Sequence, residues 1–250
     1  MSDPKNILIT GASRGIGQAI ARQAAQQGWS IGLNYNQSQT EAMSLAEELQ
    51  QMGAKVICLQ ADVSQQSHVK RMFSEFDEAL GPLHALINNA GILASIMITE
   101  VDETNVHRLY AANVFSAYYC AREAVLRMST AHGGSGGAIV NMSSVASRLG
   151  GLAGGSAYAG SKGALDSFNL ALAKEVGAQG IRVNAIRPGL IATEIHNVHG
   201  GIDQMKILAK TAVPMGRSGT AEEVAKVAMW LAGPDASYVH GSIVDVAGGR

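Results

Sequence analysis

The stretch ILITGASRGIG, at residues 7–17, decides the fold that this sequence predicts. Its first three residues form a short apolar run typical of a buried strand, and glycines follow at positions 11, 15 and 17. The next segment, QAIARQAAQQG, carries apolar side chains at helical spacing up to Gly28. Glycine lets the backbone approach a ligand closely, and a helix N-terminus attracts anions. The stretch therefore predicts a pyrophosphate site, with an ordinary glycine turn as an equal alternative from this motif alone.

Length and composition narrow the possible classes of protein. The chain has 250 residues, enough for one large α/β domain, and its net charge of -1 includes no block of like charges. We therefore expect neither nucleic acid nor a membrane as a partner. The leading MSDPKN runs directly into the first strand, so we expect no signal peptide and a cytoplasmic location. Cys58 and Cys120 lie in apolar or helical segments and are expected to be buried thiols.

Strands and helices are expected to alternate along the whole chain. This pattern predicts a single doubly wound Rossmann domain over residues 1–250, an α/β fold with a mostly parallel seven-stranded sheet and helices on both faces. A capping box of Ser38 and Glu41 is expected to start the second helix. The expected strands are 7–9, 30–35, 55–60, 83–87, 138–142, 181–186 and 242–246. The expected later helices are 64–80, 104–131, 157–176, 203–212 and 221–231.

Polar and glycine residues follow several of these strands. In a parallel sheet of this kind, ligands bind outside the carboxyl ends of the strands. Asp62, residues 88–91, Ser143, Ser144 and residues 188–189 are therefore expected to gather on one edge, together with the glycine turn.

These residues resemble the motifs of the short-chain dehydrogenase/reductase family, over essentially the whole chain. Within the family, the sequence resembles 3-oxoacyl-carrier-protein-reductase-like and glucose-dehydrogenase-like members. The matching pieces, in the family's order, are TGASRGIG (10–17), Asp62-Val63, NNAG (88–91), Asn113, NMSS (141–144), YAGSK (158–162), RPG (187–189) and a terminal GG.

Tyr158 and Lys162 are the pair that implies chemistry. They are four residues apart on an expected helix and so share one face. A phenol titrates near ~10, and a nearby ammonium lowers that value by stabilising the phenolate. Tyr158 could then give a proton to a carbonyl oxygen or take one from an alcohol. The alternative is an amphipathic helix with a surface lysine and a packed tyrosine.

The resemblance implies a role for each of four residues. Tyr158 would be the general acid and base, and Lys162 would also hold the nicotinamide ribose. Ser144 is favoured over Ser143 as the serine that binds the substrate oxygen, because the second serine of such a pair is usually the catalytic one. Asn113 would bind a water in a proton relay. The alternative role of Ser143 is structural, with its hydroxyl bonded to the local backbone. The alternative for Asn113 is a side chain held in place by packing.

NADP(H) is favoured over NAD(H) as the cofactor. NAD enzymes of this fold use a carboxylate near the end of the second strand, but residues 34–38 read NYNQS. Arg14 could pair with a 2′-phosphate in a fork geometry, although the second basic residue that many NADP(H) members carry is absent. The expected cofactor-binding residues are Gly11, Ser13, Arg14, Gly15, Ile16, Gly17, Asn34, Asp62, Val63, Asn88, Ala90, Gly91, Tyr158, Lys162, Pro188, Gly189, Ile191 and Thr193.

The sequence thus predicts an NADP(H)-dependent oxidoreductase that moves hydride between nicotinamide and a carbonyl or secondary alcohol. The alternative is a catalytically silent nucleotide-binding sensor or scaffold. The resemblance also implies a homotetramer, and residues 190–215 are expected to form a substrate lid. His196 and His199 lack further partners at ligand spacing, so we expect no metal.

Overall fold

Seven strands form one parallel sheet, in the order β3-β2-β1-β4-β5-β6-β7. Every neighbouring pair of these strands runs parallel. The computed structural model, which describes residues 5–193 and 201–250, therefore confirms the doubly wound α/β fold. Chain order reverses between β1 and β4, the position where such sheets bind ligands. The strands are β1 Asn6–Ile9, β2 Ser30–Tyr35, β3 Val56–Gln60, β4 Ala85–Asn88, β5 Gly137–Met142, β6 Ile181–Pro188 and β7 Ile243–Val246.

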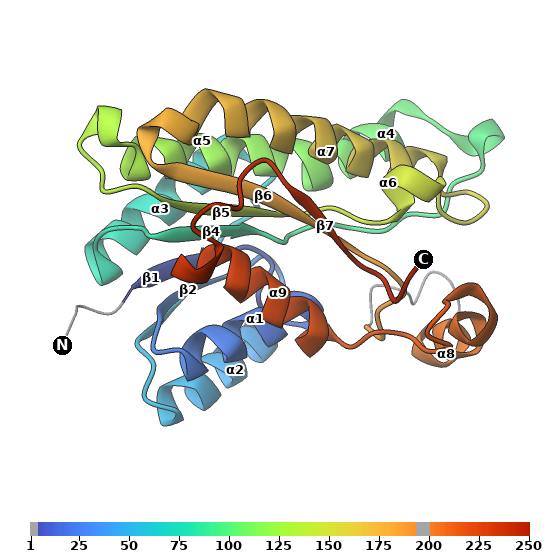
Figure 1. Cartoon of the computed structure of the whole chain (residues 1–250), viewed down its shortest axis with the longest axis horizontal. Coiled ribbons are helices and arrows are strands. Elements are labelled where there is room, and N and C mark those ends of the chain that lie inside the picture. The colour runs from blue at the N-terminus through green and yellow to red at the C-terminus, as the bar shows by residue number, and fades with distance from the viewer. Residues whose placement is uncertain (1–4, 194–200) are drawn as a thin grey trace.

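Helices cover both faces of the sheet (Figure 1). One layer holds α1, α2 and α9, and the other holds α3, α5 and α7. The short α6 and the longer α8 lie near the carboxyl end of β7, beside the last residues of the chain. The helices are α1 Gly15–Gln26, α2 Gln39–Gln51, α3 Gln66–Leu80, α4 Glu103–Tyr110, α5 Ser116–Met128, α6 Ala146–Leu149, α7 Ser156–Val176, α8 Gly201–Ala212 and α9 Ala221–Ala232.

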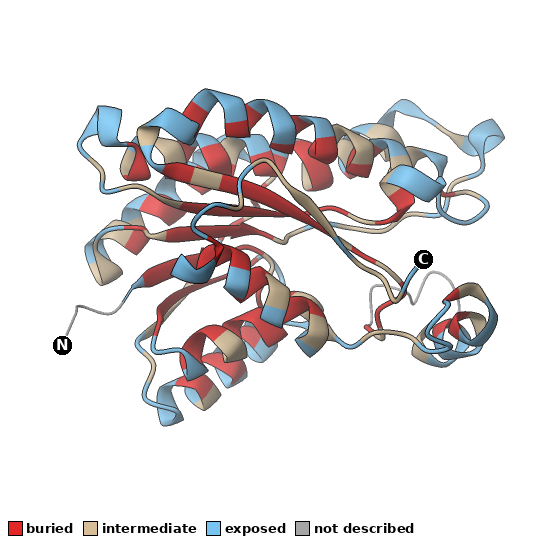
Figure 2. Ribbon diagram, viewed as in Figure 1, coloured by how far each residue is buried: buried red, intermediate tan, exposed pale blue. Residues whose placement is uncertain are grey.

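Strands β1, β4, β5 and β6 contribute buried side chains to two hydrophobic cores, one on either face. In β1, Ile7 and Ile9 pack with α1 and α9, whereas Leu8 packs with α3 and α5 on the opposite face. Side chains alternate along a strand, so a strand covered on both faces must be apolar at every position. This is why the first strand reads as an unbroken apolar run, and Figure 2 shows the buried sheet between partly exposed helices.

The helix expected over residues 104–131 is not continuous. It consists of α4, a π-helical segment Ala111–Phe115 and α5. Asn113 lies in the π-helical segment, where its amide binds the backbone of Ile92. Widened turns of this kind often occur at functional positions.

Two smaller expectations need correction or remain open. Ser38 makes no side-chain cap at α2, and the capping box is formed instead by Thr220 and Glu223 at α9. The expected lid falls partly outside the described residues, as do His196 and His199. Within the described part, Leu190 packs with Met205 and other residues of α8 in a small separate cluster.

Candidate active site

A cleft of about 1400 Å³ opens at the carboxyl ends of the strands. It collects segments far apart in sequence: the glycine turn, the ends of β2 and β3, the loop after β4, the end of β5 and the start of α7. Sixteen of the expected cofactor-binding residues line it: Gly11, Ser13, Arg14, Gly15, Ile16, Asn34, Asp62, Val63, Ala90, Gly91, Tyr158, Lys162, Pro188, Gly189, Ile191 and Thr193.

The glycine turn needs its glycines for two physical reasons. Gly11 and Gly15 have φ values of 60° and 57°, in the left-handed region that side chains disfavour. A Cβ on Gly11 would also lie 3.0 Å from the Cα atom of Ala90. The turn leads into α1, which has neither a side-chain cap nor an acidic residue in its first turn. The N-terminal amides of α1 therefore present a positive end to the cleft.

Tyr158 and Ser144 meet on the wall of the cleft. Their side chains are hydrogen-bonded to each other, and the Ser144 hydroxyl also accepts from the backbone amide of Ala146 at 3.1 Å. Burial raises the pKa of the Tyr158 phenol, and the hydrogen bond with Ser144 acts in the opposite direction. At neutral pH the phenol is therefore protonated and can serve as a proton donor.

Lys162 lies beside this pair but is held by the main chain. Its Nζ donates to the carbonyl oxygen of Met142 at 2.8 Å and lies 5.8 Å from the centroid of the Tyr158 ring. Burial lowers the pKa of Lys162 to about 8, and the carboxylate of Asp166 opposes that shift. The sequence predicted that Lys162 lowers the pKa of Tyr158. In the structure the burial of the phenol raises its pKa, and the effect of Lys162 on it stays a prediction.

The two candidate serines point to different partners. Ser143 is buried, and its hydroxyl donates to the carbonyl oxygen of Lys162 at 3.2 Å. Ser144, by contrast, bonds Tyr158. The geometry therefore places Ser144, and not Ser143, beside the phenol.

Asn113 lies behind the cleft and is not part of its lining. Its Nδ2 donates to the carbonyl oxygen of Ile92 and to the Ser161 hydroxyl, both at 3.0 Å, and its Oδ1 accepts from the Ile92 amide at 2.7 Å. Both amide hydrogens are thus used within the protein. The side chain fixes the loop after β4 against α7.

Comparison with known proteins identifies the family. A family model described as "Enoyl-(Acyl carrier protein) reductase" matches residues 11–250. This chain belongs to the short-chain dehydrogenase/reductase family. It is 47% identical over 244 residues to the oxidoreductase YgfF of Escherichia coli (strain K12), covering 97% of this chain and 98% of that protein.

Solved structures agree with that membership. A mutant short-chain dehydrogenase/reductase from Serratia marcescens has a TM-score of 0.88 and 31% sequence identity, covering 98% of this chain and 97% of that one. A dehydrogenase/reductase from Sinorhizobium meliloti 1021 has a TM-score of 0.89 and 29% identity, covering 98% and 94%. The protein is an NAD(P)-dependent short-chain dehydrogenase/reductase that acts on a small-molecule substrate.

The residues present fit an NAD(P)(H) coenzyme in this short-chain dehydrogenase/reductase. The uncapped N-terminus of α1 and the close approach of Gly11 to Ala90 form a cradle that suits a pyrophosphate. Asp62 lines the cleft, and its Oδ1 accepts from the Ser64 amide and hydroxyl at 3.0 and 2.7 Å. Its other carboxylate oxygen would remain for the adenosine half of the coenzyme.

Two expected coenzyme contacts, Gly17 and Asn88, do not line the cleft. A Cβ on Gly17 would lie 2.4 Å from the Gly11 carbonyl oxygen, so this glycine permits α1 to pack against the turn. Asn88 is buried, and its Nδ2 donates to the Oδ1 of Asn141 at 2.9 Å. Its neighbour Asn89, which the sequence did not single out, lines the cleft instead.

Asn34 and Thr10 brace the coenzyme region from behind. The Oδ1 of Asn34 accepts from the Gly11 amide at 3.1 Å, and its Nδ2 donates to the carbonyl oxygens of Leu59 and Ala61, both at 3.1 Å. The Thr10 hydroxyl accepts from the backbone amides of Asn89 and Ala90, both at 3.0 Å. Asn34 thus ties β2 to the glycine turn and to the end of β3.

The substrate end of the cleft contains residues that motif matching missed. Leu149 and Leu152 line it, whereas Met97 and Met215 do not. Leu190 and Met205, both within the expected lid, also line it, and Leu93, His107, Arg108 and Arg250 line it without a sequence signal. In the described ranges 5–193 and 201–250, no helix is long and apolar enough to cross a membrane.

Proposed function

We propose that this short-chain dehydrogenase/reductase uses NADP(H) to interconvert a carbonyl and a secondary alcohol, with Tyr158 as general acid and base. The observation that carries the proposal is the hydrogen bond between Tyr158 and Ser144 on the cleft wall, with the Lys162 ammonium close to the same ring. The nicotinamide, when bound, supplies hydride to the carbonyl carbon or accepts it from the alcohol. The chain's own residues handle the proton and the substrate oxygen.

Each side chain has a separate task in carbonyl reduction. The Ser144 hydroxyl donates a hydrogen bond to the substrate oxygen and holds it beside the phenol. Tyr158 transfers its proton to that oxygen as negative charge develops on it. The Lys162 ammonium stabilises the phenolate left behind and binds the nicotinamide ribose. Burial keeps the phenol protonated, which is the form that carbonyl reduction requires.

The charge distribution around the cleft supports NADP(H). The lining residues that follow β2 are Asn36, Gln37 and Ser38, none of them acidic, and Arg14 lines the same cleft. A 2′-phosphate would meet amides and a guanidinium there, whereas a carboxylate at this place would repel it.

The assembly and the lid belong to the same proposal. The predicted homotetramer is supported by exposed apolar side chains on the outer helices, including Tyr118 and Leu126 on α5 and Leu170 on α7. Light scattering of the purified protein measures the subunit number directly.

The lid is supported by the separate packing of α8 with Leu190 at the mouth of the cleft. A cytoplasmic location remains a prediction.

The test is the rate of NADPH oxidation, followed by absorbance, over a panel of ketones, 3-oxoacyl thioesters and polyol-related carbonyls. Tyr158→Phe removes the proton donor and keeps the ring, so kcat should fall by about 10² to 10⁴-fold. Ser144→Ala removes a donor to the reacting oxygen and should cost about 10²-fold.

The matched control is Ser143→Ala, which removes a hydroxyl from the neighbouring position. Because Ser143 bonds the helix backbone, its loss should reduce kcat far less than the loss of Ser144. Coenzyme binding by Tyr158→Phe, measured by fluorescence titration, checks that the variant is folded. Full turnover in Tyr158→Phe would contradict the proposal. Coenzyme binding by the wild type without turnover of any substrate would favour the sensor hypothesis.

A further inference from the structure

A second buried charge lies one turn along α7 from Lys162. Asp166 follows Lys162 by four residues, so the two side chains share a face of the helix, and both are buried. Burial disfavours an ammonium, and the Asp166 carboxylate offsets part of that effect on the pKa of Lys162. Asp166 itself does not line the cleft.

Asp166 is itself paired, but with only one of its oxygens. Arg187 on β6 donates to Oδ2 through Nε at 3.0 Å and through Nη2 at 2.8 Å. The other oxygen, Oδ1, is buried and has no hydrogen-bond partner among the described residues. An unpartnered buried carboxylate oxygen costs free energy, so this geometry is not the one that stability alone would favour.

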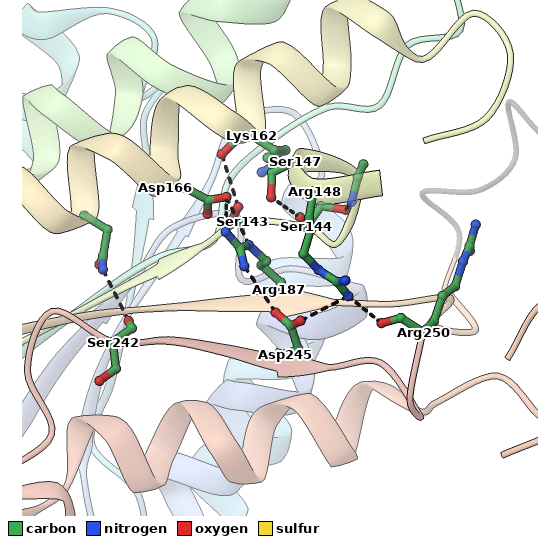
Figure 3. Close-up of polar contacts among 12 residues, drawn as sticks. Ser143, Ser144, Ser147, Arg148, Lys162, Asp166, Arg187, Ser242, Asp245 and Arg250 are labelled. Atoms are coloured by element: carbon green, nitrogen blue, oxygen red, sulfur yellow. Dashed lines mark hydrogen bonds and ion pairs between the residues drawn. The ribbon is translucent and has the colours of Figure 1, made fainter. Parts of the chain in front are cut away.

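The charges continue away from Lys162 in alternating sign (Figure 3). Arg187 lies 3.6 Å from the Oδ1 of Asp245 on β7, and the Oδ2 of Asp245 lies 3.4 Å from Arg148 on α6. Arg148 also donates to the carbonyl oxygen of Arg250 at 2.8 Å. This series of charged side chains thus comprises Asp166 from α7, Arg187 from β6, Asp245 from β7 and Arg148 from α6, and the Tyr158 ring lies on the cleft side of Lys162.

We propose that Asp166 and Arg187 are positioning residues that together set the charge of Lys162. Asp166, the nearer of the two, keeps the ammonium charged in its buried site. Arg187 holds the carboxylate in place and limits the strength of its field. The inference rests on the proposed function, because a charged Lys162 matters for turnover only if it stabilises the Tyr158 phenolate.

The two partners should shift the titration of Lys162 in opposite directions. Asp166→Asn removes the carboxylate and leaves the Arg187 cation, so the midpoint should fall by about one pH unit or more. Arg187→Gln leaves the carboxylate unneutralised, so the midpoint should rise. Asp245→Asn removes a more distant carboxylate and should produce a smaller fall. A role in packing alone would weaken folding in all three variants without opposite shifts.

The primary measurement needs no turnover. Trace acetylation of the intact protein over a range of pH, read by mass spectrometry of the Lys162 peptide, gives the titration midpoint directly. The second readout is the alkaline limb of the pH profile of kcat/KM for NADPH oxidation, which should move with that midpoint. Asp166→Glu keeps the carboxylate and should restore much of the wild-type midpoint.

Glu123→Gln is the matched control, because it breaks another partly buried ion pair, with Arg127, on the far part of α5. It should lower the melting temperature and leave the Lys162 midpoint unchanged.

An unchanged Lys162 midpoint in folded Asp166→Asn would overturn the inference, as would shifts of the same sign in Asp166→Asn and Arg187→Gln. If Asp166→Asn fails to fold, Arg187→Gln and Asp245→Asn still give shifts of opposite sign. Shifted midpoints with an unmoved activity profile would support the inference and contradict the catalytic role proposed for Lys162.

Discussion

The side chains that follow β2 show how a single charge could select the coenzyme. Asn36 is exposed, lines the cleft and sits among neutral polar neighbours. Asn36→Asp places a carboxylate where the proposal puts the 2′-phosphate of NADP(H). The kcat/KM for NADPH should fall at least about tenfold, equivalent to about 1.4 kcal/mol, while that for NADH is kept or improved.

The measurement for Asn36→Asp is the ratio of kcat/KM for the two coenzymes with one carbonyl substrate. Gln51→Glu adds the same charge at an exposed position at the end of α2, outside the cleft, and should leave the ratio unchanged. An equal loss with both coenzymes would show that Asn36 does not face the 2′-position.

The adjacent Asn88 and Asn89 show that a motif does not identify which of its residues faces a ligand. The motif NNAG predicts that the loop after β4 reaches the coenzyme, but it does not say which asparagine faces the cleft. Strand geometry decides this, because successive side chains point to opposite faces. Asn88 ends β4 and points into the protein, where it bonds Asn141, and Asn141 in turn donates to Asn169 at 3.2 Å. Asn89 points to the glycine turn and donates to the carbonyl oxygens of Thr10 and Gly11.

The bounds of a helix or strand were predictable where the local sequence pattern alone determines them. The expected second strand, 30–35, has the observed bounds, because its apolar run ends at polar residues where the sheet ends. The π-helical segment at Asn113 was not predictable from the helical period, and the Ile92 backbone that Asn113 contacts lies 21 residues away in the sequence. The charges from Asp166 to Arg148 were missed for the same reason: four separate elements supply them.

The junction of α1 with the glycine turn allows a test of packing. A Cβ on Gly17 would lie 2.4 Å from the Gly11 carbonyl oxygen and 2.6 Å from the Nδ2 of Asn89. Gly17→Ala should therefore push α1 away from the turn, lowering the free energy of unfolding by about 1–3 kcal/mol and weakening NADPH binding. Urea denaturation and coenzyme titration measure the two effects.

Gly163→Ala is the matched control, since Gly163 lies inside α7 and an added Cβ would have no heavy atom within 4 Å. Alanine is the better helix former, so this variant should gain about 0.5–1 kcal/mol. Unchanged stability and coenzyme affinity in Gly17→Ala would show that the turn tolerates a displacement of α1.

The two ends of the sheet are built for different purposes. The carboxyl end carries the cleft, whereas side chains at the amino end close the sheet by bonding its backbone. The Nδ1 of His84 accepts from the Asn6 amide at 3.0 Å, and the Nδ1 of His240 accepts from the Val183 amide at 3.0 Å. A protonated imidazole has no acceptor nitrogen, so both contacts require neutral histidine.

This requirement links the stability of the folded protein to pH through His84. Burial lowers the pKa of His84, and the nearby charge of Lys5 lowers it further. The contribution of His84 to stability is complete above its ordinary pKa of about 6.5, and it is lost as the pH falls through the lowered pKa of the folded state. Between those two values the unfolded chain binds more protons, so the free energy of unfolding rises with pH.

His84→Asn should flatten that pH dependence, because an amide oxygen replaces Nδ1 as the acceptor and does not titrate. The measurement is the free energy of unfolding by urea at several pH values from about 7 down to about 5, compared as the difference between variant and wild type. His68→Asn changes an exposed histidine on α3 and should keep the wild-type slope. Equal slopes for His84→Asn and the wild type would mean that the contact with Asn6 survives protonation of the ring. The amino end of the sheet would then be held by the Nδ2 of Asn6, which donates to the carbonyl oxygens of Leu80 and Pro82.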